Sequence, residues 1–118
     1  MRKFNSGATR DTEEDKLDYE GFLSPLVIEA FGRYMHKHRI QADGKLRASD
    51  NWQKHFGEEH YSVCMKSLMR HLLDLWKEHR GFESREGIED ALMGILFNTM
   101  AYTDKYLKEQ RSNKEVLK

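Results

Sequence analysis

The sequence is short of cysteine and proline, has no long apolar run and carries no net charge. The single cysteine, Cys64, excludes an intramolecular disulfide and a zinc site built from cysteines, which fits a reducing cytoplasm. No run of about 18 apolar residues is present for a membrane span, and the polar start MRKFNSGATRDTEEDK lacks the apolar core of a signal peptide. We therefore expect a cytoplasmic protein without a membrane partner.

The charge balance also bears on the class of partner. Lys and Arg (20) equal Asp and Glu (20), and the basic residues are interleaved with acidic ones. A nucleic-acid-binding domain usually carries a basic excess, because phosphate neutralisation supplies most of its affinity. A local basic patch is compatible with these counts, but no nucleic-acid partner is expected.

What the chain does contain is typical of helix. With one proline and a second half rich in Leu, Met, Glu and Lys, the 118 residues predict a single all-α domain. Residues 1–22 are polar without a sustained period, which leaves two interpretations open, a disordered end or a lid that orders over a site. We place the domain at residues 23–110 and a frayed tail at residues 111–118.

Local signals mark where the helices begin and end. Ser24 is a good N-cap and Pro25 suits the first helical position, so a helix begins there and precedes a loop with Asp43-Gly44 as its turn. A second helix is expected from about His60 to Arg80, with Gly81 as its C-terminal cap.

A third helix, capped by Ser84, is expected to run to about Gln110. Because the connection from residue 81 to residue 83 is short, the last two helices should pack as a central antiparallel hairpin in a small helical bundle. The third helix is apolar around much of its circumference. It therefore needs two covered faces, which predicts that oligomerisation completes the bundle.

Acidic residues recur along one side of this hairpin. In RHLLDLWKE, residues 71, 74 and 78 share a helical face. Folding the chain about residue 82 places Glu78 near Glu86 and Asp74 near Asp90, with Glu89 beside them. The candidate carboxylates are Asp74, Glu78, Glu86, Glu89 and Asp90.

So many carboxylates at one interface would raise each other's pKa unless a cation lay between them. Hard oxygen ligands without cysteine suit Mg²⁺ or Mn²⁺. The alternative is a solvated acidic surface whose partners are Lys77 and Arg85. Spacing alone leaves both open, and it does not say whether the acids converge within one chain or across two.

Three further residues have a structural and a functional interpretation. His71 is a hydrogen-bonded core residue or a supporting group of the cation site. Asn98 either reads a base edge or bonds the backbone, and Trp52 is either a core residue or a platform on which a base stacks.

Four segments together resemble a known family. SGATRDTEEDKLDYEGFLSP, DNWQKHFG, MKSLMRHLLDLWKEHRG and IEDALMGILFNTMAYTDKYL look like the phage-encoded dGTP/dATP diphosphohydrolase N-terminal domain family, over residues 6–107. That family resembles the all-α MazG-like nucleotide pyrophosphatases. These use acids from two adjacent helices to hold Mg²⁺ or Mn²⁺, cleave a (d)NTP to the monophosphate and pyrophosphate, and work as dimers or tetramers.

The resemblance implies a metal-dependent (d)NTP pyrophosphatase that adjusts a nucleotide pool in the host cytoplasm, with a purine deoxynucleotide as substrate. Asp74 and Glu78 would be catalytic, with Glu78 orienting or deprotonating the attacking water. The phosphates would be bound by basic residues of the N-terminal segment and the first helix. These are Arg10, Lys16, Arg33, Lys37 and Arg39.

The acidic pattern departs from that of the superfamily. Glu-Glu-x-x-Glu is usual on the first of its helices, whereas this chain lacks the leading pair and has His71 in that region. The departure keeps two other functions open. One is a catalytically inactive module that binds and sequesters a nucleotide, and the other is a small helical protein that docks on a phage or host partner.

Overall fold

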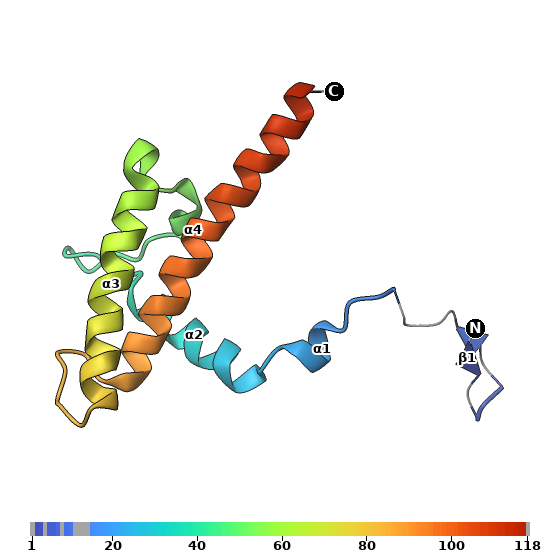
Figure 1. Cartoon of the computed structure of the whole chain (residues 1–118), viewed down its shortest axis with the longest axis horizontal. Coiled ribbons are helices and arrows are strands. Elements are labelled where there is room, and N and C mark those ends of the chain that lie inside the picture. The colour runs from blue at the N-terminus through green and yellow to red at the C-terminus, as the bar shows by residue number, and fades with distance from the viewer. Residues whose placement is uncertain (1, 4, 8, 11–14, 118) are drawn as a thin grey trace.

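The structure, a computed structural model, describes residues 2–3, 5–7, 9–10 and 15–117. Within these ranges helix is the main secondary structure and the strands are two short ones, which confirms the all-α prediction (Figure 1). The body consists of α2 (Pro25–Lys37), α3 (His60–His79) and α4 (Ile88–Leu117). The N-terminal segment contains the antiparallel pair β1 (Arg2–Lys3) and β2 (Thr9–Arg10), followed by the short α1 (Tyr19–Phe22).

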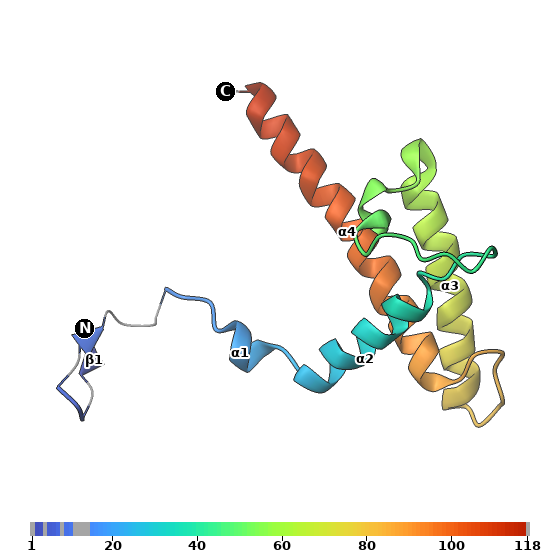
Figure 2. The same cartoon turned by 180° about the vertical axis from the view of Figure 1, so that it is seen from behind.

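The first long helix begins where the sequence predicts. The Ser24 Oγ accepts a hydrogen bond from the Val27 amide at 3.3 Å, and Pro25 occupies the first helical position. α2 then crosses one side of the hairpin formed by α3 and α4 (Figure 2). Tyr34 is its buried anchor there, only 8% exposed.

The turn that joins α3 to α4 is set by a glycine. The Phe82 amide donates to the Lys77 carbonyl at 2.8 Å and the Gly81 amide to the Glu78 carbonyl at 3.0 Å. This pair of bonds is a Schellman motif, which requires the left-handed conformation that Gly81 adopts at φ +86°. Gly81 thus ends α3, and the loop over residues 80–87, longer than the predicted connection, reverses the chain. The two helices α3 and α4 lie side by side and antiparallel, as predicted (Figure 1).

The limits of α4 differ from those the sequence indicates. The Ser84 Oγ accepts from the Gly87 amide at 2.9 Å, so its hydroxyl stabilises the loop, and the helix begins at Ile88. At the other end α4 continues past Gln110 to Leu117. Ion pairs at i,i+4 spacing, such as Lys108 with Asp104 at 2.9 Å, support the helix as it approaches that end.

Small and polar side chains fill the seam between α3 and α4. Ala91 and Ala101 are 0% and 1% exposed, and such small residues let the two helices approach closely. The buried His60 Nε2 donates to the Ala101 carbonyl at 2.8 Å, and the Asn98 Nδ2 donates to the Ser67 Oγ at 3.2 Å. The seam is thus held by specific polar contacts as well as by packing.

α3 and α4 also carry large exposed apolar residues that do not line the cavity described below. On α3 and α4 they recur at helical spacing, which places them on one flank of each helix. This uncovered face consists of Met65, Met69, Leu72, Trp76, Ile88, Leu92, Tyr102 and Tyr106.

The overall dimensions are large for a single chain of this length. The radius of gyration is 19.5 Å, against about 13–14 Å for a compact domain of this length. Much of the difference comes from the N-terminal segment, which extends away from the body (Figure 1). Among the described residues, no helix combines the length and the apolar character that crossing a bilayer requires.

Candidate functional site

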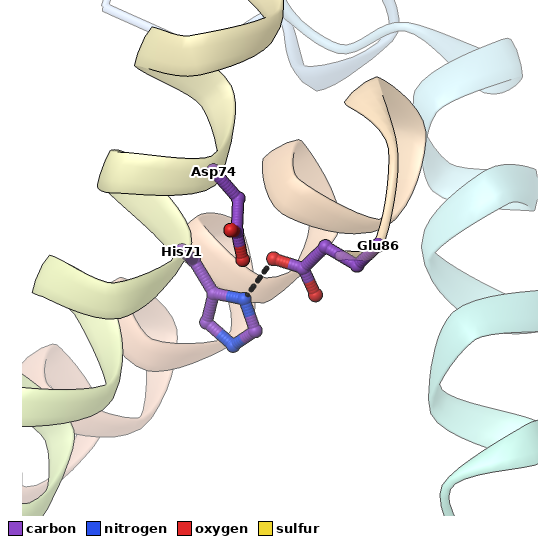
Figure 3. Close-up of side chains that lie close together, drawn as sticks. All are labelled: His71, Asp74 and Glu86. Atoms are coloured by element: carbon purple, nitrogen blue, oxygen red, sulfur yellow. Dashed lines mark hydrogen bonds and ion pairs between the residues drawn. The ribbon is translucent and has the colours of Figure 1, made fainter. Parts of the chain in front are cut away.

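Three side chains converge at the end of the hairpin nearest its turn. His71 and Asp74 come from α3, and Glu86 comes from the loop just before α4 (Figure 3). One ligand atom from each lies within 4.8 Å of the other two. Asp74 is 3% exposed and the other two are half-buried. Of the residues that the structure describes, these three form the group with the spacing of a metal site.

The cluster is held by short polar contacts. The His71 Nδ1 and the Glu86 Oε1 are 2.6 Å apart, and the Arg85 Nε and Nη2 donate to the Asp74 Oδ2 at 2.8 and 2.7 Å. The Arg85 guanidinium lowers the pKa of Asp74, and burial opposes this effect. The cluster thus consists of the side chains of His71, Asp74 and Glu86, with the Arg85 guanidinium against Asp74.

This donor set fits a divalent cation. Carboxylates suit Mg²⁺ and Mn²⁺, and an imidazole nitrogen among the ligands shifts the preference toward Mn²⁺, the softer of the two. A positive group, the Arg85 guanidinium, already lies against the buried Asp74 carboxylate. The guanidinium therefore occupies the Asp74 oxygen that a metal ion would use.

The other predicted acids lie elsewhere. The Glu78 Oε1 accepts from the Ser84 amide and hydroxyl at 3.0 and 3.1 Å, so this carboxylate braces the loop. Asp90 pairs with Lys37 at 2.6 Å. Glu89 is exposed and makes no short contact with the cluster. The structure thus brings together two of the five predicted carboxylates and adds His71, which we expected in a supporting position.

A cavity of about 750 Å³ lies between α2, the loop that follows it and the hairpin. Its lining contains basic and aromatic side chains but no Asp or Glu, in a chain with as many acidic as basic residues. The basic residues of the lining are His36, His38, Arg39, Arg47, Lys54, His55 and Arg70.

The positive charge of this cavity is largely unneutralised. Among the described residues, no carboxylate lies within ion-pair distance of Arg39, Arg47, Lys54 or Arg70. Arg39 and Arg47 instead donate to backbone carbonyls, Arg39 to the carbonyl of Arg47 at 2.8 Å and Arg47 to that of His38 at 3.2 Å. These bonds fix the two guanidinium groups and leave further donors for an anion.

The cluster and the cavity are neighbours. Tyr34 and His38, whose rings are in edge contact at 4.2 Å, both line the cavity. Burial raises the pKa of Tyr34, and the charges of Glu86 and Asp90 add to that rise. Burial lowers the pKa of His38, and Asp90 opposes that shift. Ser67 and Arg70, which also line the cavity, lie within one turn of His71 on α3, so the cluster lies beside the cavity.

Two residues predicted to contact a base do line the cavity. Trp52 is half-buried and its ring meets that of Phe97 edge to face, with centroids 6.4 Å apart. Asn98 is buried and its amide is used within the hairpin, donating to Ser67 and to the Gly94 carbonyl. Asn98 therefore has the structural role that the sequence left open, whereas the indole of Trp52 remains available on one side.

The predicted phosphate-binding residues are scattered. Arg33 pairs with Glu29 on the exposed side of α2, and Lys37 is held by Asp90. Lys16 is exposed in the extended N-terminal segment. The side chain of Arg10 lies outside the described residues. Of the basic residues proposed for phosphates, Arg39 is the one that lines the cavity.

Sequence reasoning missed Arg47, Lys54 and Arg70 as members of one group. They come from a loop, a 3₁₀ turn and α3, so no spacing in the sequence connects them. The stretch HKHRI followed by KLR was the available signal, because two basic runs flank a tight turn there. No family model, curated protein or solved structure matches this chain.

Proposed function

We propose that the protein is a metal-dependent (d)NTP pyrophosphatase that releases a (d)NMP and pyrophosphate, with a purine deoxynucleotide as the favoured substrate. One observation carries the proposal: a cavity lined by basic and aromatic side chains, without a carboxylate, borders a cluster of His71, Asp74 and Glu86. The base preference and a role in the nucleotide pool of a phage-infected cell follow from the family resemblance alone.

The cavity has the properties that a nucleotide requires. Its volume falls within the range of about 300–1,000 Å³ that is typical of small-molecule sites. Guanidinium groups bind phosphate through paired hydrogen bonds, and Arg39, Arg47 and Arg70 supply such groups. The Trp52 indole offers a face on which a base can stack.

The neighbouring cluster would supply the metal ligands for hydrolysis. His71, Asp74 and Glu86 would hold the metal, which when bound neutralises phosphate charge and lowers the pKa of a water. Glu78 is bound to Ser84 and Asp90 is paired with Lys37, so neither of these carboxylates is free to orient the water in this structure. The cavity arginines would stabilise the leaving pyrophosphate.

A second candidate function is supported by the Arg85 contact. Arg85 already neutralises Asp74, so a protein that binds a nucleotide without hydrolysing it would need no metal at this position. Such a module would use the cavity alone and sequester the nucleotide.

A screen of the common NTPs and dNTPs with Mn²⁺, detecting pyrophosphate, tests the proposal. We expect turnover of a purine dNTP by the wild type and its loss in Asp74→Asn and Glu86→Gln. Arg47→Gln should weaken nucleotide binding by about tenfold, the loss of one charge-assisted contact. Arg33→Gln is the matched control, because Arg33 is an exposed arginine whose partner is Glu29.

The outcomes separate the two candidates. Nucleotide-dependent thermal stabilisation without pyrophosphate release would identify the sequestering module. Turnover that survives both Asp74→Asn and Glu86→Gln would contradict the assignment of the metal site.

We also propose that a second copy of the chain covers the uncovered face defined above. A symmetric dimer would pack the two apolar faces together and extend the hairpin to a four-helix bundle. Trp76, 56% exposed, lies on this face and is the kind of residue that dominates such interfaces.

A further inference from the structure

Arg85 approaches Asp74 from the solvent side. The Asp74 side chain is 4% exposed, whereas the side chain of Arg85 is 58% exposed. Both guanidinium hydrogen bonds go to the same oxygen, Asp74 Oδ2. A buried carboxylate is therefore neutralised by a guanidinium whose side chain is largely exposed to solvent.

The loop that carries Arg85 is bounded by two glycines in the left-handed conformation. Gly81 has φ +86° and Gly87 has φ +84°. Between them the Glu78 carboxylate binds Ser84, so the first part of the loop is fixed to α3. Within the part of the chain that the structure describes, the polar contacts of the Arg85 side chain are with Asp74 alone. It can therefore leave Asp74 without the loop unfolding.

The Arg85 guanidinium and a divalent metal ion would compete for the Asp74 carboxylate. Asp74 and Glu86 contribute two negative charges, and Arg85 contributes one positive charge. A divalent cation bound at Asp74 would give the site a net positive charge while repelling the guanidinium at close range. A phosphate group of a nucleotide would then be the natural partner of the released guanidinium.

We propose that Arg85 is a cation with two positions: it neutralises Asp74 before a metal binds, and it turns to a substrate phosphate once a divalent cation takes the Asp74 carboxylate. The inference rests on the proposed function for the metal and for the phosphate ligand. It assigns phosphate binding to Arg85, which the sequence indicates only as an ion-pair partner of a solvated acidic surface.

Mn²⁺ titration by calorimetry tests the first position, using the full chain without nucleotide. We expect Arg85→Gln to bind Mn²⁺ about tenfold more tightly than the wild type, because the competing hydrogen-bonded charge is removed. Arg85→Lys keeps the positive charge but loses the paired donors of the guanidinium, so its Mn²⁺ affinity should lie between those of the wild type and Arg85→Gln. Arg80→Gln is the control, because Arg80 lies over the Trp76 ring at 5.7 Å near the same turn.

A non-hydrolysable dNTP analogue in the presence of Mn²⁺ tests the second position. We expect Arg85→Gln to bind it about tenfold more weakly than the wild type, although Mn²⁺ binds more tightly. Mn²⁺ binding by the wild type that is unchanged or weaker in Arg85→Gln would overturn the inference and leave the metal site standing. Absence of Mn²⁺ binding in both proteins would overturn the proposed metal-dependent function and the inference with it.

Discussion

The His71 ring occupies the space that a side chain at position 94 would need. A Cβ built on Gly94 would lie 2.6 Å from the Cγ, Cδ2 and Cε1 of His71, far inside van der Waals contact. The same imidazole is bound to Glu86 at 2.6 Å, so it cannot move aside without losing that contact. A glycine in the second turn of α4 thus positions a member of the candidate metal site.

Gly94→Ala should therefore destabilise the protein, whereas Gly32→Ala should not. Both glycines lie inside helices, but nothing lies within 4 Å of a Cβ at position 32. Alanine favours helix over glycine by about 1 kcal/mol in both places, while overpacking at position 94 costs about 1–3 kcal/mol. Denaturant unfolding should show Gly94→Ala to be less stable than Gly32→Ala by about that overpacking cost. Equal stabilities would contradict the close approach of His71.

Glu78→Gln should affect stability and leave metal binding intact. The Glu78 carboxylate accepts two hydrogen bonds from Ser84, and hydrogen bonds to a charged group contribute about 1.5–3 kcal/mol. We expect a lower free energy of unfolding with an unchanged Mn²⁺ affinity, measured by denaturation and calorimetry. Glu86→Gln is the comparison, because it should lose Mn²⁺ binding. A Glu78→Gln variant that loses the metal would restore Glu78 to the site.

The stabilisation from Asp74 should disappear in acid. Its contact with Arg85 holds the pKa of Asp74 below the ordinary value of 3.8 in the folded protein. A carboxylate with a depressed folded pKa stabilises above its unfolded pKa, and this contribution is lost as the pH falls through the folded pKa. The difference in unfolding free energy between the wild type and Asp74→Asn should thus be largest above about pH 5. It should shrink as the pH falls below 3.8, the ordinary pKa of the group.

Unfolding free energies across this pH range, measured with a metal chelator present, check the effect. In an Arg85→Gln background the pH-dependent part of the difference should diminish, since the guanidinium is the largest cause of the shift. A difference that grows as the pH falls would have the wrong sign for this contact.

Leu72→Lys should weaken self-association. Leu72 is 44% exposed on the uncovered face, and burying a leucine against a second copy contributes about 1.5–3 kcal/mol. Sedimentation should show a dimer or larger assembly for the wild type and at least about tenfold weaker association for the variant. Lys66→Glu, an exposed polar position on α3, should behave as the wild type does. A wild type that is monomeric at high concentration would refute the dimer.

The sequence predicts those parts of the fold that depend on local chemistry. Ser24 with Pro25 and Gly81 mark helix ends through bonds within a few residues, so each was recognisable from composition. The prediction that Ser84 caps the third helix was wrong, because its hydroxyl accepts from the Gly87 amide within the loop and its amide donates to Glu78. No local pattern in the sequence shows which of these partners Ser84 takes.

The site was predictable only in part for the same reason. The hairpin was predicted, but the pairs across it were not. We expected Glu78 near Glu86 and Asp74 near Asp90, whereas the loop over residues 80–87 brings Glu86 to Asp74 and His71. The cavity depends on Arg47 and Arg70, which approach one another because the loop after α2 folds over α3. Contacts between segments so far apart in the chain have no periodic signal in the sequence.

The polar seam of the hairpin has a consequence for its alignment. A seam of leucines can slide by one helical turn at modest cost, because one apolar contact replaces another. Here a slide would separate His60 from the Ala101 carbonyl and Ser67 from Asn98 at the same moment, and would press the His71 ring against a larger residue than Gly94. The two helices therefore have one permitted register, and that register sets the distance between the carboxylates and the cavity.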